Sequence, residues 1–118
     1  MYKIEYTQKF KRRIKKLSKR YTNIKKDYAH LLEELKQGNL PGDQMQSFPG
    51  TVYKVRVASS DQKKGKSGGF RFIYYVIFDD NTAYMMTVYA KSKKTDLSSQ
   101  DRQEITDFII SLQAQTEG

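Results

Sequence analysis

Cationic side chains recur on three segments of the chain that have the alternating pattern of β-strands. Lys54 and Arg56 lie two positions apart in the first segment, Arg71 lies at the start of the second, and Lys91 follows the third. Side chains two apart on a strand share a face of the sheet, so Lys54 and Arg56 are expected to lie side by side. Cations gathered on one face repel one another unless an anion lies among them, and the pattern therefore indicates a phosphate site. The alternative is that strand cations only protect a sheet edge from pairing with another chain.

A basic, glycine-rich stretch joins the first two of these segments. Residues 63–69 read Lys-Lys-Gly-Lys-Ser-Gly-Gly, and glycines let a backbone approach a ligand closely or adopt positive φ. The stretch is therefore predicted to be a mobile basic finger. The sequence Gly65-Lys66-Ser67 does not make a nucleotide P-loop, because Ser60 stands where that motif needs a glycine and a strand follows instead of a helix.

The composition favours an anionic partner and gives no support for metal or thiol chemistry. Lys and Arg number 22 against 13 Asp and Glu, a net charge of +9, which favours nucleic acid, an acidic protein or an anionic membrane. The chain has no cysteine and a single histidine, His30, so an ordinary zinc site and a Ser-His-Asp triad are not expected. The acidic residues are scattered, which argues against a two-metal nuclease, and no cofactor is predicted. No signal peptide is recognised and no apolar stretch reaches the roughly 20 residues of a membrane helix, so a cytoplasmic protein is expected.

The N-terminal third predicts one strand and two helices. Residues 2–6 alternate apolar and charged side chains, as in a half-buried strand, and Thr7 lies where a helix N-cap is expected. Apolar residues then recur twice at helical spacing, and Gly38 followed by Asn39 ends the second series in the manner of a C-cap. The short connection between the two series predicts an antiparallel helical hairpin. Its buried positions are Phe10, Ile14, Leu17, Tyr21, Ile24, Tyr28, Leu31, Leu32 and Leu35. The basic residues of the first helix form a solvated face or contact phosphates without sequence preference.

The rest of the chain predicts a loop, three strands and a last helix. Residues 40–50 contain both prolines and are expected to form a loop. The three strands are residues 52–58, 70–78 and 83–89, and the last two form a hairpin through the turn 79–81. Ser98 with Asp101 resembles a capping box that starts the last helix, and the polar tail 113–118 is expected to fray.

The element order β-α-α-β-β-β-α predicts one α+β domain over residues 1–118. Its expected architecture is a small, antiparallel-dominated sheet of about four strands, with an N-terminal helical hairpin and a C-terminal helix packed on it. Side chains that alternate with the cations are expected to point to the helices. They are Val55, Val57, Ile73 and Val88.

Three motifs together resemble the RelE/ParE superfamily of bacterial toxins, and most closely its HigB-like branch. They are Lys-Val-Arg-Val-Ala at 54–58, Gly-Lys-Ser-Gly-Gly-Phe-Arg-Phe-Ile-Tyr-Tyr at 65–75 and Thr-Val-Tyr-Ala-Lys-Ser at 87–92. The middle motif is the specific one. The resemblance covers nearly the whole chain, because the predicted order of elements is also that of the family.

The resemblance implies a toxin of a bacterial type II toxin–antitoxin system, an endoribonuclease that enters the ribosomal A site and cuts mRNA. The implied chemistry is metal-free, since the ribose 2′-OH attacks the adjacent phosphate and leaves a 2′,3′-cyclic phosphate. By the same resemblance Lys54 is the candidate general base, Arg56 holds phosphate, and Arg71 clamps the scissile phosphate. Lys91 matches the lysine that follows the last strand in the family. The implied partners are a cognate antitoxin, for which a helix-turn-helix protein is one candidate, the ribosome and mRNA, and no membrane.

Further basic and aromatic side chains are predicted to bind the RNA. Tyr75 and Tyr89 are expected to stack on bases, since proteins that cut RNA splay bases onto aromatic rings. The full predicted RNA-binding set is Lys63, Lys64, Lys66, Tyr75, Tyr89, Lys93 and Lys94. The chain departs from the best-known members at Ser92, where they carry an arginine, and a late tyrosine of some members has no match near Ser98.

Two other functions fit the same features. A ParE-like protein of the same fold would poison DNA gyrase without cutting RNA. A non-catalytic relative would bind RNA or the ribosome and leave the message intact. The basic sheet face favours the endoribonuclease over the gyrase poison, whereas the serine at position 92 favours the non-catalytic relative.

Overall fold

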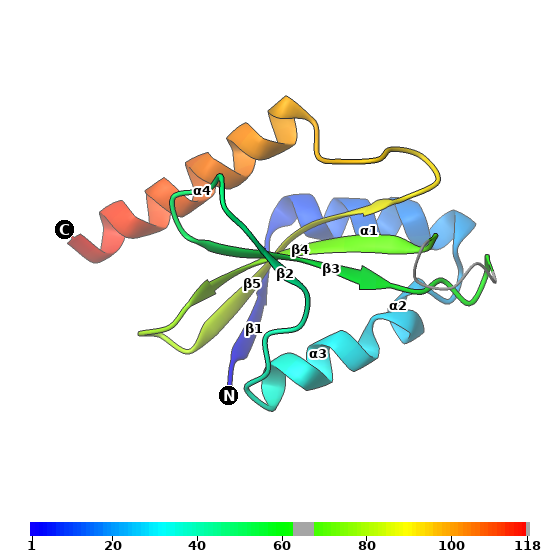
Figure 1. Ribbon diagram of the computed structural model, residues 1–118, viewed down its shortest axis with the longest axis horizontal. Helices are drawn as coiled ribbons and strands as arrows, with labels where there is room; N and C mark the ends of the chain where they lie inside the picture. Colours follow the sequence, from blue (N-terminus) through cyan, green and yellow to red (C-terminus); the bar gives the residue numbers. More distant parts are fainter. Residues whose placement is uncertain (63–67, 118) are drawn as a thin grey trace.

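A five-stranded sheet forms the centre of the protein, which the computed structural model describes over residues 1–62 and 68–117 (Figure 1). In spatial order its strands are β1 (Lys3–Tyr6), β5 (Thr82–Ala90), β4 (Phe70–Ile77), β3 (Thr51–Val57) and β2 (Asp43–Met45). The helices are α1 (Gln8–Arg20), α2 (Ile24–Asp27), α3 (Ala29–Lys36) and α4 (Ser99–Glu117). β1 runs parallel to β5, and all other neighbours in the sheet are antiparallel. The predicted α+β class and the antiparallel-dominated sheet are confirmed.

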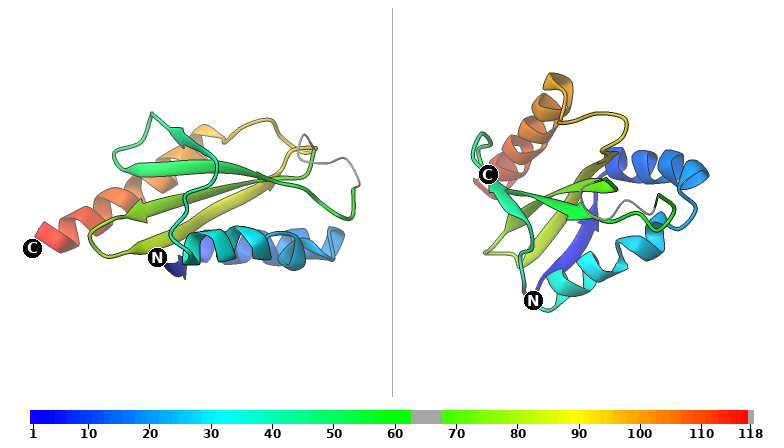
Figure 2. Two further views of the ribbon diagram at one scale, coloured as in Figure 1. Left: turned by 60° about the horizontal axis from the view of Figure 1, so that its bottom comes forward. Right: turned by 45° about the vertical axis from the view of Figure 1, so that its right-hand side comes forward.

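Each face of the sheet has its own hydrophobic core, because the side chains of the central strands alternate between the faces. Phe70 and Phe72 of β4 pack in the cluster that α1, α2 and α3 complete, whereas Ile73 packs with Ile109 of α4 on the other face. Figure 2 shows α1–α3 on one side of the sheet and α4 on the other. Ile73 therefore packs against a helix as expected, but on the same face as Arg71.

The predicted helical hairpin is confirmed at its start and is wrong in its second helix. The side chain of Thr7 caps α1 by accepting a hydrogen bond from the backbone N–H of Phe10 at 3.1 Å. Tyr28 has φ −98° and ψ 4°, which separates α2 from α3 where one continuous helix was predicted. The Tyr28 ring packs against Phe72 with a centroid distance of 4.9 Å and against Phe10 at 6.0 Å. Core packing thus holds the residue that interrupts the helix.

Two further predictions about local structure are corrected. The predicted loop 40–50 contains β2, which pairs with the first half of β3. Gly42 leads into it with φ +97°, and a Cβ atom there would lie 2.4 Å from the carbonyl oxygen of Lys54, so only glycine fits. The C-terminal tail does not fray from position 113, because α4 continues to Glu117. None of the helices in the described part of the chain has the length and apolar character to cross a bilayer.

Candidate active site

A row of three predicted site residues crosses the central strands. Arg56 of β3 is the direct partner of Arg71 on β4, and Arg71 is the direct partner of Tyr89 on β5. Direct partners in an antiparallel pair share a face, with Cβ atoms about 5 Å apart. Lys54 lies two positions before Arg56 and shares the same face. This is the face that α4 covers at the other end of the sheet, where Ile73 is fully buried.

These side chains line a groove of about 470 Å³, called here the cation groove. Its lining residues include all four predicted catalytic residues, which are Lys54, Arg56, Arg71 and Lys91. Tyr89 also lines it, and Asp43 is the only carboxylate-bearing residue among its described lining residues. The structure therefore brings the four cations to one place, while their catalytic roles stay predictions.

Arg71 is the most buried of the four cations. Its side chain is 6% exposed, and Nη1 donates to the carbonyl oxygens of Gly68 at 2.8 Å and Phe70 at 3.2 Å. Burial, followed by the neighbouring Arg56, lowers the pKa of Arg71, and Tyr89 opposes this change. Two guanidinium groups that face each other across a strand pair repel, so the groove has a favourable position for an anion.

Lys91 is fixed just beyond the end of β5. Its backbone N–H donates to the carbonyl oxygen of Gly69 at 2.9 Å, and its Nζ donates to the carbonyl oxygen of Thr95 at 3.3 Å. The carbonyls of two consecutive glycines, Gly68 and Gly69, thus hold Arg71 and Lys91 respectively.

The Tyr89 ring cannot stack on a base as predicted, because the residue is only 4% exposed. Its hydroxyl is buried and has no hydrogen-bond partner among the described residues. Burial and then Asp96 raise the pKa of Tyr89, and Arg71 and Arg102 oppose them. The hydroxyl therefore keeps its proton at neutral pH and is a hydrogen-bond donor beside Arg71.

Asp96 is a charged residue near the groove that the sequence analysis did not single out. The backbone N–H of Leu97 donates to its carboxylate at 2.8 Å, and this bond is the main cause of its lowered pKa. Desolvation opposes the change, and the positive charges of Lys54 and Arg102 add to it. Only the tertiary structure shows this proximity to Lys54, because 42 positions separate the two residues in the sequence.

The other predicted RNA-binding residues do not gather in the cation groove. Tyr75 is 5% exposed and packs under α4, stacked on Tyr84 at a centroid distance of 6.3 Å, so a base cannot reach its face. Lys93 is exposed and lines a second groove of about 680 Å³ between α1 and the start of α4. Lys94 also lines that second groove, but it is paired with a carboxylate. Lys63, Lys64 and Lys66 lie outside the described residues.

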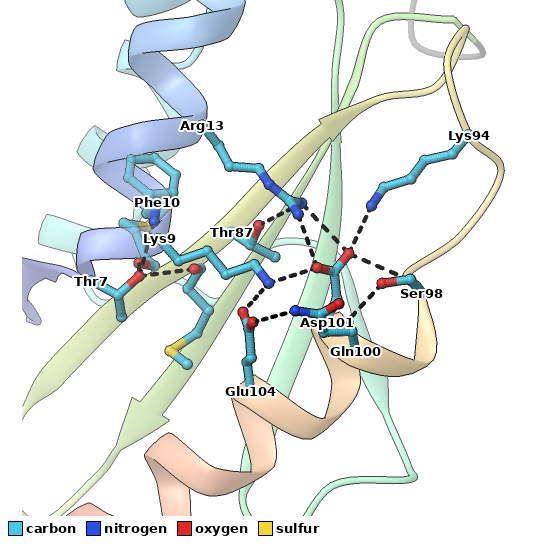
Figure 3. Close-up of polar contacts among 12 residues, drawn as sticks. Thr7, Lys9, Phe10, Arg13, Thr87, Lys94, Ser98, Gln100, Asp101 and Glu104 are labelled. Atoms are coloured by element: carbon cyan, nitrogen blue, oxygen red, sulfur yellow. Dashed lines mark hydrogen bonds and ion pairs between the residues drawn. The ribbon is translucent and has the colours of Figure 1, made fainter.

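The carboxylate that pairs with Lys94 belongs to Asp101, which is 2% exposed (Figure 3). Lys9 approaches its Oδ1 at 2.6 Å, Arg13 approaches the same oxygen at 2.9 Å, and Lys94 approaches Oδ2 at 2.7 Å. Lys9 also pairs with Glu104. These five residues are called here the Asp101 cluster.

The Asp101 cluster joins α1, the loop after β5, and the start of α4. Burial alone would raise the pKa of Asp101, but hydrogen bonds from Lys9, Lys94 and Arg13 outweigh it and hold that pKa well below its ordinary value. The backbone N–H of Asp101 donates to Ser98 Oγ at 3.0 Å, which confirms the predicted cap of α4. Two carboxylates offset most of the charge of the three cations, and the ion pairs tie α1 and the loop after β5 to the start of α4.

No group of three or more His, Asp or Glu residues in the described ranges is arranged to hold a metal ion. The cation groove itself is lined by Lys, Arg and Tyr side chains, which are groups that bind phosphate and stabilise its charge.

The fold and the site define a class of small, basic proteins with a central sheet and a cation-lined groove at one end of that sheet. Residues 3–117 match the protein family described as the RelE toxin of the RelE/RelB toxin–antitoxin system. Among solved structures, the isolated E. coli RelE toxin is similar, with a TM-score of 0.53 and 19% sequence identity over 92% of this chain and 99% of that one. A double mutant of E. coli toxin RelE in the free state has a TM-score of 0.53 and 20% identity over 79% of this chain and 86% of that one.

The chain therefore belongs to the RelE family of toxins. Toxins of this family are ribosome-dependent mRNA endoribonucleases, so the prediction of a toxin that cuts mRNA is confirmed at the level of the family. The family also implies a RelB-type antitoxin as the partner.

Proposed function

We propose that the cation groove holds the scissile phosphate of an mRNA on the ribosome and cleaves the strand without a metal ion. Lys54, reacting as the neutral amine, takes the proton of the ribose 2′-OH on its Nζ, and the 2′-oxygen then bonds to the adjacent phosphorus. The bond from phosphorus to the 5′-oxygen breaks, and Lys91 gives that oxygen a proton. The products are a 2′,3′-cyclic phosphate and a free 5′-hydroxyl, so every proton and electron pair is accounted for.

Arg71 and Arg56 stabilise the extra negative charge that the phosphate carries in the transition state, and Tyr89 adds a hydrogen bond from its hydroxyl. The observation that supports these roles is the direct pairing of Arg71 with both Arg56 and Tyr89 across three strands. Preorganised donors in a water-poor site give more stabilisation than the same groups in water. Burial of Arg71 supplies that condition here.

The test is cleavage of a defined mRNA on purified ribosomes, with the product ends analysed for the cyclic phosphate. Arg71→Ala should lower the cleavage rate about 100- to 1,000-fold, the usual effect of removing a main donor to the transition state. Lys36→Ala removes an equal charge from the exposed end of α3 and should cleave at the wild-type rate. Wild-type cleavage by Arg71→Ala would contradict the proposal.

The ribosome cleavage assay, together with an assay of DNA gyrase activity, separates the two rival functions. Intact message on a ribosome that retains the protein would indicate a non-catalytic relative. Inhibition of DNA gyrase without any RNA product would indicate a ParE-like poison.

Three finer assignments complete the proposal. The motif at residues 65–75 supports the HigB-like branch. A helix-turn-helix protein is the proposed antitoxin, and work on ribosomes implies the cytoplasm. Purification of the toxin with the protein encoded beside it, followed by a test of that partner for DNA binding, checks the first two assignments together.

A further inference from the structure

The two-residue turn Gly68–Gly69 holds two of the proposed catalytic residues from different strands. The carbonyl of Gly68 accepts from Nη1 of Arg71 at 2.8 Å, and the carbonyl of Gly69 accepts from the backbone N–H of Lys91 at 2.9 Å. Any displacement of this turn therefore moves hydrogen-bond partners of both residues at once.

One side of the turn is pressed against the end of β3. Gly69 has φ +56°, a conformation that favours glycine, and a Cβ atom there would lie 2.3 Å from the carbonyl oxygen of Val57. Any larger residue at position 69 would therefore push the turn away from β3. Movement away from β3 is limited by a different contact.

That contact comes from the side chain of Gln62. Its Oε1 accepts from the backbone N–H of Gly69 at 3.0 Å, and its Nε2 donates to the hydroxyls of Tyr21 at 3.2 Å and Ser92 at 3.3 Å. A backbone N–H can only donate, so the amide must direct its oxygen to Gly69 and its NH₂ group to the two hydroxyls.

The far end of this link is anchored in the core. Tyr21 is 3% exposed, and its ring packs edge-on against Phe70 at a centroid distance of 5.1 Å. Its hydroxyl also lies 3.3 Å from Ser92 Oγ, so Gln62, Tyr21 and Ser92 form a closed triangle of hydrogen bonds. Ser92 directly follows Lys91, and the triangle therefore braces the chain next to Lys91 as well as the Gly68–Gly69 turn.

We infer that Gln62 is a positioning residue for the cleavage reaction, which it supports by fixing the Gly68–Gly69 turn that holds Arg71 and Lys91. This inference rests on the proposed function of the cation groove. Gln62 does not line that groove and contacts no reacting atom.

The test is the single-turnover cleavage rate of Gln62→Leu on saturating amounts of mRNA-programmed ribosomes. Leucine keeps the approximate volume and removes all three side-chain hydrogen bonds. A displacement of catalytic groups by about 1 Å costs on the order of 100-fold in rate, so a loss between about 10- and 100-fold is expected. Ribosome affinity should stay at the wild-type value, because the substitution changes no charge. Gln103→Leu, which removes an exposed amide bound only to Asp107 on the same helix, should cleave normally.

A double-mutant cycle separates positioning from a general effect on the fold. In the background of Arg71→Lys the substitution Gln62→Leu should cause a clearly smaller loss, because the guanidinium that the turn holds is already gone. An equal loss in both backgrounds would overturn the inference. Tyr21→Phe keeps the ring and removes the anchoring hydroxyl, so it should reproduce part of the loss even if Gln62→Leu does not fold.

The outcomes also distinguish this inference from the proposed function. Wild-type cleavage by Gln62→Leu, or by Tyr21→Phe where Gln62→Leu does not fold, together with an inactive Arg71→Ala, would refute the positioning role alone. Wild-type cleavage by Arg71→Ala would refute the function of the groove.

Discussion

Two clusters of cations line two grooves that share Tyr89, and they differ in what balances their charge. In the Asp101 cluster three cations surround one buried carboxylate, and Glu104 adds a second one. In the cation groove four cations accompany one carboxylate-bearing residue, Asp43, among the described lining residues. The residue types are the same, so type alone does not distinguish a structural cation from a functional one. The distinction lies in whether the protein supplies the counter-charge itself or leaves a position for a ligand to supply it.

The comparison predicts that the Asp101 cluster carries stability. Asp101→Asn removes the charge that three cations share, and loss of one partner from a buried ion pair costs about 3–5 kcal/mol in the free energy of unfolding. Urea unfolding measures this loss. Glu104→Gln is the matched control and should cost less than about 1 kcal/mol, because that carboxylate is partly exposed. A loss below about 1 kcal/mol for Asp101→Asn would mean that the cluster is not structural.

Acid should remove part of the same stability. The pKa of Asp101 is lower in the folded protein than in the unfolded chain, so the stabilisation is present above the unfolded pKa of about 4 and is lost as the pH falls below it. The lowered pKa values of Asp96 and Glu104 act in the same direction. The difference in unfolding free energy between wild type and Asp101→Asn should be smaller at pH 3 than at pH 5. These two values lie about one unit on either side of the unfolded pKa. A constant difference over that interval would contradict the assignment.

The cation groove should show the opposite relation between function and stability. Arg56→Met removes a phosphate-binding group and should lower mRNA cleavage about 10- to 100-fold. The same change relieves the repulsion with Arg71, so the free energy of unfolding should stay equal or rise by up to about 1 kcal/mol. Lys36→Met, at the exposed end of α3, is the control for loss of one charge and should leave cleavage unchanged. Destabilisation by Arg56→Met as large as that of Asp101→Asn would remove the contrast between the two clusters.

Tyr89→Phe should have the smallest effect. The variant loses one hydrogen bond to the bound phosphate, worth about 1 kcal/mol, so cleavage should fall about three- to tenfold. Stability should not decrease, since the buried hydroxyl has no partner among the described residues. Cleavage and urea unfolding of the same preparation measure both quantities. Unchanged cleavage would exclude the tyrosine from the mechanism.

Alternation along the strands was sufficient to predict which cations meet. Lys54, Arg56 and Arg71 lie on regular strands, where a period of two fixes the face and antiparallel pairing fixes the neighbours. The break at Tyr28 could not be predicted, because no glycine or proline marks it. The packing of its ring on Phe10 and Phe72 determines the local backbone, and both contacts come from other elements.

The same limit explains why the sequence could not place every predicted site residue. Lys93 and Lys94 are identical in type and adjacent in sequence, yet only Lys94 is neutralised, by a carboxylate that the turn into α4 brings back to it. The sequence does not distinguish Tyr75 from Tyr89, but in the structure α4 covers the ring of Tyr75. Gln62 gives no signal in the sequence at all, since its partners Tyr21 and Ser92 lie 41 and 30 positions away.

The parallel pairing of β1 with β5 bears on how this toxin is made. Lys3 pairs with Thr82, so β1 cannot pair with β5 until almost eighty further residues have left the synthesising ribosome. Translation proceeds from the N-terminus, and a nascent chain that has emerged only as far as Ile77 has no strand between β1 and β4 to close the sheet. Tyr89, Lys91 and Thr95 emerge last of the described groove residues. A translation product that stops before β5 therefore lacks an assembled cation groove. The active enzyme forms only when synthesis is nearly complete.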